Sequence, residues 1–156
     1  MAKPQDRAKW AYMFSDDVKF TQKIILLKPN TPQYFLILKR AIESKTRPND
    51  WDLPGGNVLY GENNLDSLQK EVFEETGLRI KQQIIKPVLV HTALRPEKGF
   101  YLVYIGHVYQ LQSEEDIFLS TEHTEFKWVT ATEFLNLNCQ AKLINQTIIE
   151  YFNLNL

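Results

Sequence analysis

The sequence contains few residues that would place it outside the cell or in a membrane. Its single cysteine, Cys139, cannot form an intramolecular disulfide, which is typical of a protein in a reducing cytoplasm. No apolar run approaches the roughly 20 residues that span a bilayer. Residues 1–9 are polar and have no apolar signal-peptide core. The sequence therefore predicts a soluble, cytoplasmic protein without a membrane partner.

An excess of charge of either sign is also lacking. The chain has 18 Lys and Arg residues against 19 Asp and Glu residues, a net charge of −1. Surfaces that bind nucleic acid usually carry a basic patch, so nucleic acid is not expected as a partner. The length of 156 residues predicts one domain, 1–156, in which residues 1–18 form an N-terminal arm. A homodimer is left open.

The most informative stretch runs from Trp51 to Leu78. Within it, the apolar residues Leu65, Leu68 and Val72 recur three and four residues apart, which predicts a helix over 65–76 with one face toward a core. Asn63 or Asn64 can cap the start of this helix. Gly77 suits the left-handed residue that ends it. Residues 54–56, Pro-Gly-Gly, predict a tight turn ahead of the helix.

Three carboxylates gather at the end of the predicted helix. Glu71, Glu74 and Glu75 stand at positions i, i+3 and i+4 and share one helix face. Like charges at this spacing repel, which destabilises a bare helix by a few tenths of a kcal/mol per pair. A hard divalent cation would offset the repulsion, and Mg²⁺ (or Mn²⁺) prefers carboxylate oxygens. The alternative is a solvated acidic helix face.

The spacing of the whole stretch resembles a known motif. It reads Gly56, five residues, Glu62, seven residues, then residues 70–78, KEVFEETGL. This string resembles the Nudix box of the Nudix hydrolase superfamily, and residues 51–55 are similar to the usual lead-in. One position differs, because Lys70 stands where the family pattern has Arg. The resemblance implies an α/β/α sandwich with a mixed β-sheet between helices.

The remaining pattern agrees with that α/β fold. Strands in hairpins with helices around them favour a mixed sheet covered on both faces. From apolar runs and turn signals, the expected strands are 19–28, 34–39, 51–53, one or two within 79–94 bent near Pro87, 100–111 and 126–129. The expected C-terminal helices begin at Thr130 or Thr132 and at Ala141.

The resemblance also implies roles for individual residues. Glu71, Glu74 and Glu75 are the expected metal ligands, with Glu71 as an alternative orienter of the attacking water. The Gly55 carbonyl is a further expected ligand. Glu62 is expected to be either a ligand or the partner of Lys70. The general base is either a glutamate of the box or an acid ahead of the last strand, where Glu122 comes first and Glu125 second.

The resemblance implies a small-molecule nucleotide substrate, hydrolysed at a phosphoanhydride of a nucleoside diphosphate linked to another moiety. A nucleoside triphosphate or a nucleotide sugar is the favoured form, with ADP-ribose or a dinucleoside polyphosphate as alternatives. Arg40, Arg47 and Arg95 are the expected substrate-binding residues, although a solvated loop explains Arg40 and Arg47 equally well. Two further alternatives are a non-catalytic nucleotide sensor and an isoprenoid diphosphate isomerase. An RNA-end pyrophosphohydrolase is disfavoured by the acidic balance.

Overall fold

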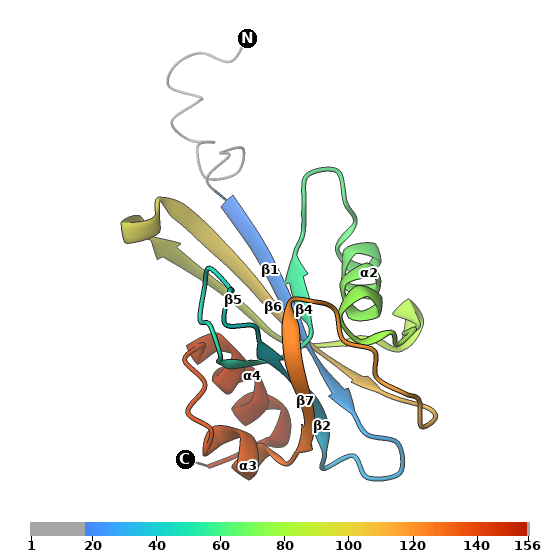
Figure 1. Ribbon diagram of the computed structural model, residues 1–156. Helices are drawn as coiled ribbons and strands as arrows, with labels where there is room; N and C mark the ends of the chain where they lie inside the picture. Colours follow the sequence, from blue (N-terminus) through green and yellow to red (C-terminus); the bar gives the residue numbers. More distant parts are fainter. Residues whose placement is uncertain (1–17, 156) are drawn as a thin grey trace, which may run out of the picture.

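The computed structural model describes residues 18–155 (Figure 1). The N-terminal arm expected over 1–18 therefore lies, apart from Val18, outside the described residues. So do Trp10, Tyr12 and Phe14, which alternate along it. Within the described residues, no helix is long and apolar enough to cross a membrane.

A seven-stranded mixed sheet forms the centre of the described fold. Its strands are β1 (Val18–Leu27), β2 (Phe35–Arg40), β3 (Trp51–Asp52), β4 (Gly55–Asn57), β5 (Lys86–Arg95), β6 (Phe100–Gln110) and β7 (His123–Val129). The main order is β3-β2-β1-β6-β5, with β4 paired to β1 and β7 paired to β2. Strands β1 and β6 run parallel over their whole paired length, while the other pairs are antiparallel.

Strands β1 and β2 form the expected hairpin but part immediately after its turn. Only Leu27 and Phe35 are register partners across this pair. The rest of β1 pairs with β6 and β4, whereas the rest of β2 pairs with β7 and β3. The sheet consequently opens between β1 and β2, and the cavity described below is lined by residues from both strands.

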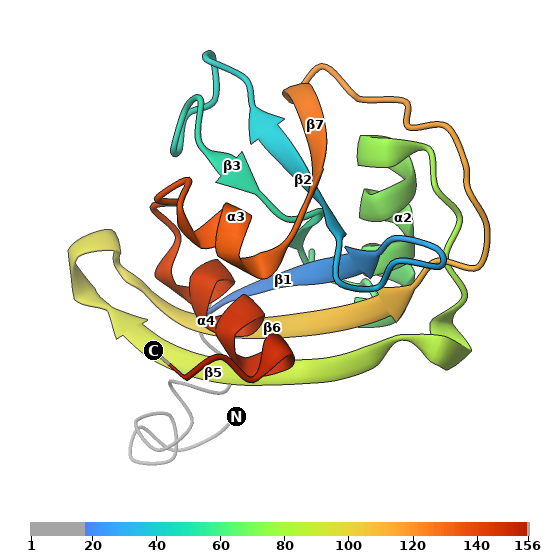
Figure 2. The same cartoon turned by 90° about the horizontal axis from the view of Figure 1, so that it is seen from below.

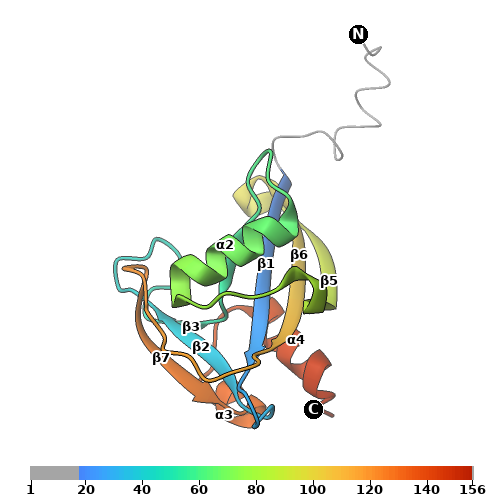
Figure 3. The ribbon, with the colours of Figure 1, turned by 90° about the vertical axis from the view of Figure 1, so that its right-hand side faces the viewer.

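Helices cover both faces of the sheet (Figure 3). Helix α2 (Asn64–Thr76) lies on one side, and helices α3 (Ala131–Leu135) and α4 (Lys142–Phe152) lie on the other. Figure 2 shows α3 and α4 next to each other, on the side of the sheet away from α2. This arrangement confirms the α/β/α sandwich with a mixed sheet.

The apolar run of β1 explains the layering. Ile24 and Leu26 pack in the cluster that contains Leu68 and Val72 of α2. Ile25 and Leu27 pack in the opposite cluster, with residues of α3 and α4. Successive strand residues face opposite sides, so four consecutive apolar residues fill two cores.

Two local expectations need adjustment. The tight turn expected over 54–56 is wrong beyond Pro54, because Gly55–Asn57 is strand β4 paired with β1. The segment 79–94 holds a 3-10 helix, η1 (Gln82–Ile84), before β5. The bend expected near Pro87 is confirmed by a register shift between Pro87 and Leu89. A second 3-10 turn, η2 (Pro96–Lys98), joins β5 to β6.

Candidate active site

Helix α2 has well-defined ends that fix where its glutamates lie. Asn63 caps the start, because its side chain accepts hydrogen bonds from the backbone N–H groups of Leu65 and Asp66 at 3.0 and 3.4 Å. Gly77 ends the helix with a φ of 77°, a conformation that costs glycine little. Both caps agree with the prediction from sequence, and Glu75 consequently lies in the last turn.

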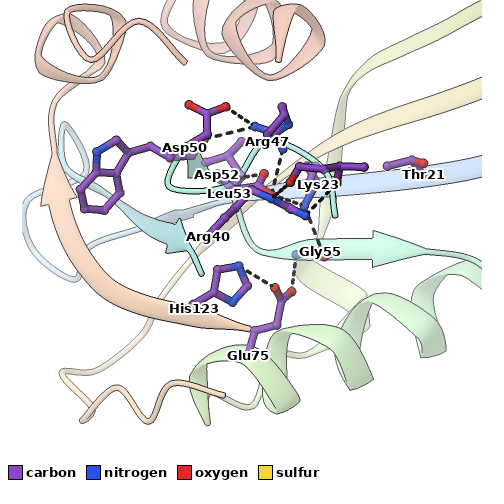
Figure 4. Close-up of polar contacts among 12 residues, drawn as sticks. Thr21, Lys23, Arg40, Arg47, Asp50, Asp52, Leu53, Gly55, Glu75 and His123 are labelled. Atoms are coloured by element: carbon purple, nitrogen blue, oxygen red, sulfur yellow. Dashed lines mark hydrogen bonds and ion pairs between the residues drawn. The ribbon is translucent and has the colours of Figure 1, made fainter. Parts of the chain in front are cut away.

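Glu75 is the most buried glutamate of the box, with 4% of the residue exposed. Its Oε1 accepts a hydrogen bond of 2.8 Å from the backbone N–H of Gly55. Its Oε2 lies 3.4 Å from Nε2 of His123, at the start of β7 (Figure 4). The Glu75 carboxyl group thus joins the box helix to β4 on one side and to β7 on the other.

The two glycines of β4 allow the carboxylates to approach the strand. Gly55 has a φ of 134°, which side-chain-bearing residues rarely adopt. A Cβ atom on Gly56 would lie 2.9 Å from Cδ of Glu71. The half-buried Glu71 side chain therefore packs directly against the β4 backbone, next to Glu75.

Burial changes the acidity of these groups. Burial raises the pKa of Glu75 to about 8, although Lys23 and the Gly55 N–H oppose the rise. Burial and the neighbouring Glu74 also raise the pKa of Glu71. Burial lowers the pKa of His123 to about 4. Both shifts favour the uncharged forms, so burial weakens the contact between His123 and Glu75 as an ion pair.

A cluster of cations forms the opposite part of the site, organised by Asp52. This side chain is fully buried, and its Oδ2 lies 3.0 Å from Lys23 Nζ, 2.8 Å from Arg40 Nη1 and 3.0 Å from Arg47 Nη2 (Figure 4). Burial opposes ionisation of Asp52, but Lys23 and Arg47 outweigh it and lower its pKa to about 2. Arg47 Nη1 also lies 2.6 Å from Oδ2 of Asp50, so three cations face two carboxylates and one positive charge remains in excess.

Both groups of residues face one cavity of about 660 Å³. Glu71 and Glu75 line it from α2, and Lys23, Arg40 and Arg47 line it from β1, β2 and the loop after β2. The remaining lining residues are Lys19, Thr21, Ala41, Glu43, Ser44, Thr46, Gly55, Gly56, Asn57, Leu59, Thr121, Glu122 and His123. We call the helix side of this cavity the acid wall (Glu71, Glu75) and the strand side the cation wall (Lys23, Arg40, Arg47, Asp52).

Glu122 reaches the same cavity from the segment before β7. Its side chain is exposed, and its backbone carbonyl accepts a 2.9 Å hydrogen bond from the N–H of Ala41. One ligand atom from each of Glu75, Glu122 and His123 lies within 4.8 Å of the other two. A divalent metal fits this donor set, because Glu75 and Glu122 supply carboxylate oxygens and His123 supplies an imidazole nitrogen, and carboxylate oxygens suit Mg²⁺ and Mn²⁺.

The other expected site residues lie elsewhere. Lys70 Nζ contacts Glu62 Oε2 at 3.3 Å, and a metal contact by Glu62 stays a prediction. Glu74 is exposed and does not line the cavity. Arg95 lies at the end of β5 as the register partner of Phe100 and is likewise outside the cavity lining.

Lys23 and Asp52 are the site residues that sequence reasoning missed. The sequence nevertheless contains an indication that each of these two residues is unusual. Lys23 stands directly before four apolar residues of a strand, and Asp52 stands between Trp51 and Leu53, all of them buried. A charge inside a buried strand requires a partner of opposite charge, but the sequence alone does not show that these two residues meet.

Comparison with known proteins agrees with this geometry. The model of the NUDIX domain matches residues 21–151. The chain therefore belongs to the Nudix hydrolase family, whose members act on nucleoside diphosphate derivatives.

Two relatives illustrate the range of the family. The chain is 26% identical over 119 residues to the nucleoside triphosphatase NudI of Enterobacter sp. (strain 638), with 70% of this chain and 83% of the relative covered. It is 29% identical over 122 residues to the asymmetrical bis(5'-nucleosyl)-tetraphosphatase of Rattus norvegicus, with 76% and 78% covered.

Solved structures share the fold. The MutT protein from Methanosarcina mazei Go1 superimposes with a TM-score of 0.73 at 21% identity, covering 90% of this chain and 96% of that one. The NUDIX domain of Shewanella oneidensis NrtR, complexed with ADP ribose, gives a TM-score of 0.73 at 15% identity, covering 98% of both chains.

Proposed function

We propose that this protein is a Mg²⁺- or Mn²⁺-dependent pyrophosphohydrolase whose substrate is a nucleoside triphosphate. The observation that carries the proposal is the single cavity in which the acid wall faces the cation wall. A polyphosphate chain has negative charge along its length and needs cations on several sides. The similarity to a nucleoside triphosphatase over 70% of this chain favours this substrate over a nucleotide sugar.

The metal would be held by Glu71 and Glu75, assisted by Glu122 or His123 and by the carbonyl of Gly55. The chemistry that such an ion supplies when bound is polarisation of a phosphoryl oxygen and activation of water. Ion binding would favour the ionised form of Glu75, whose pKa burial raises to about 8. The N–H of Gly55, which donates to Glu75 at 2.8 Å, would keep the carboxylate oriented.

The chain's other groups would position the substrate. Arg40 and Arg47 each donate to Asp52, and both still line the cavity, so their charge would neutralise the phosphates without large rearrangement. Glu122 is exposed at the cavity, where its carboxylate can contact water. It is therefore the proposed acceptor of the proton from the attacking water.

A substrate panel tests this proposal. The ribonucleoside and deoxyribonucleoside triphosphates, ADP-ribose, nucleotide sugars and dinucleoside polyphosphates would be incubated with Mg²⁺ or Mn²⁺, and the products resolved by phosphorus NMR. We expect monophosphate and pyrophosphate from at least one triphosphate, faster than from the other classes. Preferred cleavage of another class, or turnover of none, would overturn it.

Two variants separate the proposed site from a contaminating activity. Glu75→Gln should lower kcat by at least about a hundredfold, because the ligand charge is lost while the hydrogen bond from Gly55 is retained. Glu150→Gln changes an exposed glutamate of α4, on the far side of the sheet, and should leave kcat unchanged. Equal activity of both variants would place the reaction elsewhere.

A further inference from the structure

A second, shallower cavity of about 390 Å³ adjoins the first. The two share Lys19, Asn57 and Leu59 among their lining residues. A ligand held between the acid and cation walls can therefore extend into the second cavity without leaving the surface.

The two cavities differ in chemistry. Among the described residues that line the first cavity, none is Phe, Tyr or Trp. The second is lined by Phe20, Tyr60 and Phe100. A planar base gains most from stacking on an aromatic ring, and the larger cavity offers no such ring for it.

Lys19 lies where the cavities meet. Its Nζ is 5.3 Å from the centroid of the Phe100 ring, a distance at which the ammonium group and the ring attract each other. The pair places a positive charge beside an aromatic face. This combination suits a phosphate joined to an aromatic base, because the charge and the ring would contact adjacent parts of one ligand.

The loop that supplies Leu59 is held by the box itself. Glu62 accepts a 3.1 Å hydrogen bond from the N–H of Leu59 through Oε1, and its Oε2 pairs with Lys70 at 3.3 Å. The N–H of Glu62 in turn donates to the Leu59 carbonyl at 3.0 Å. The pair of Lys70 and Glu62 thus supports the wall of the second cavity. This structural role does not require either side chain to contact a phosphate.

We propose that Phe100, Lys19 and Leu59 form a binding site for the nucleobase of the substrate, with Phe100 as the stacking surface. The inference rests on the proposed function, since it names where that substrate would place its base. The metal and the phosphates occupy the first cavity, and the base lies in the second.

Calorimetric titration with AMP, GMP, CMP and UMP, and with ribose 5-phosphate as a probe that lacks the base, tests this site. All five would be measured in Mg²⁺, and none contains a phosphoanhydride bond. At least one nucleotide should bind about tenfold more tightly than ribose 5-phosphate, as stacking predicts. Phe100→Ala should abolish that preference and leave the affinity for ribose 5-phosphate unchanged.

The matched control is Phe118→Ala, which removes a ring that is 69% exposed and lines neither cavity; it should keep the preference. Equal binding of nucleotides and ribose 5-phosphate by the wild type, or binding of no nucleotide, would overturn the inference. An equal loss of both affinities in Phe100→Ala would also overturn it. A base preference without turnover in the substrate panel would refute the proposed function but not this site.

Discussion

The two walls of the main cavity are built in opposite ways. The acid wall comes from one helix turn, where Glu71 and Glu75 are four residues apart and packed against β4. The cation wall joins Lys23 of β1, Arg40 of β2, Arg47 of the following loop and Asp52 of β3. Local helix geometry creates the first wall, whereas the second exists only once the sheet has formed. Their expected sensitivities to mutation therefore differ.

After Glu75→Gln, the largest effect is expected from a group outside both walls, Glu122. Glu122→Gln should lower kcat by about a hundredfold, because the amide cannot take a proton from water. The local backbone structure should be preserved, because the hydrogen bond with Ala41 is made by the backbone carbonyl of residue 122. Steady-state kinetics would measure kcat, and a Mn²⁺ titration of the activity would measure metal binding. An unchanged kcat would indicate that the general base is a glutamate of the acid wall and not Glu122.

A mutation in the cation wall should lower the free energy of unfolding. Asp52→Asn leaves Lys23, Arg40 and Arg47 without their shared counter-charge, and breaking buried pairs of this kind costs about 3 kcal/mol. Urea denaturation would measure the free energy of unfolding. Glu114→Gln, at an exposed acid, is the control and should change it little. A stable Asp52→Asn protein would show that the cation wall does not depend on Asp52.

The acid wall should instead respond to pH when metal is absent. Burial raises the pKa of Glu75 from 4.5 to about 8, so the folded state holds a proton that the unfolded state has lost. The stability this proton supplies is complete below pH 4.5 and is lost as the pH rises through about 8. Burial lowers the pKa of His107 and His123 to about 4, so these two imidazoles oppose the fall below their usual pKa of 6.5. Thermal unfolding in EDTA should therefore show a Tm that falls between pH 6.5 and about 8.

The same experiment on Glu75→Gln supplies the comparison. The amide does not titrate, so this variant should lose most of the fall in Tm. Asp52 does not interfere, because its lowered pKa of about 2 affects stability only in acid, below the usual aspartate pKa of 3.8. Identical Tm profiles for wild type and variant would exclude Glu75 as the source.

The difference between the walls also explains what could be predicted from the sequence. Helix period, caps and the Nudix box located Glu71 and Glu75, because their relation is local. The buried strands followed from their apolar runs. The meeting of Lys23 with Asp52, 29 residues apart, depends on how β1, β2 and β3 associate, which no local pattern encodes. The contact between His123 and Glu75 likewise joins two elements, β7 and α2, and no local pattern encodes it.

Glu74 shows the limit of the local argument. It shares the helix face with Glu71 and Glu75 by spacing, yet its side chain is exposed and does not line the cavity. Strand β4 packs on Glu71 and hydrogen-bonds to Glu75. Its position therefore distinguishes these two glutamates from Glu74. A direct metal contact by Glu74 stays a prediction.

The smallest effect is expected at Lys70. Lys70→Arg should preserve or slightly raise kcat/KM, because arginine can also reach Glu62 and holds a carboxylate with two hydrogen bonds. Lys70→Met, which breaks the pair, should weaken nucleotide binding more than it lowers kcat, since Glu62 supports the loop of Leu59. Separate kcat and KM values distinguish these outcomes. A large loss in Lys70→Arg would mean that the site requires the ammonium group itself.

The proposed hydrolysis depends on a divalent metal bound at the acid wall. A Mn²⁺ titration followed by electron paramagnetic resonance, comparing wild type with Glu75→Gln, would measure this binding. We expect saturable binding by the wild type and affinity at least about tenfold weaker in the variant, as when a charged ligand is removed. Equal Mn²⁺ affinity of the two proteins, or no saturable binding by the wild type, would contradict the proposed metal site.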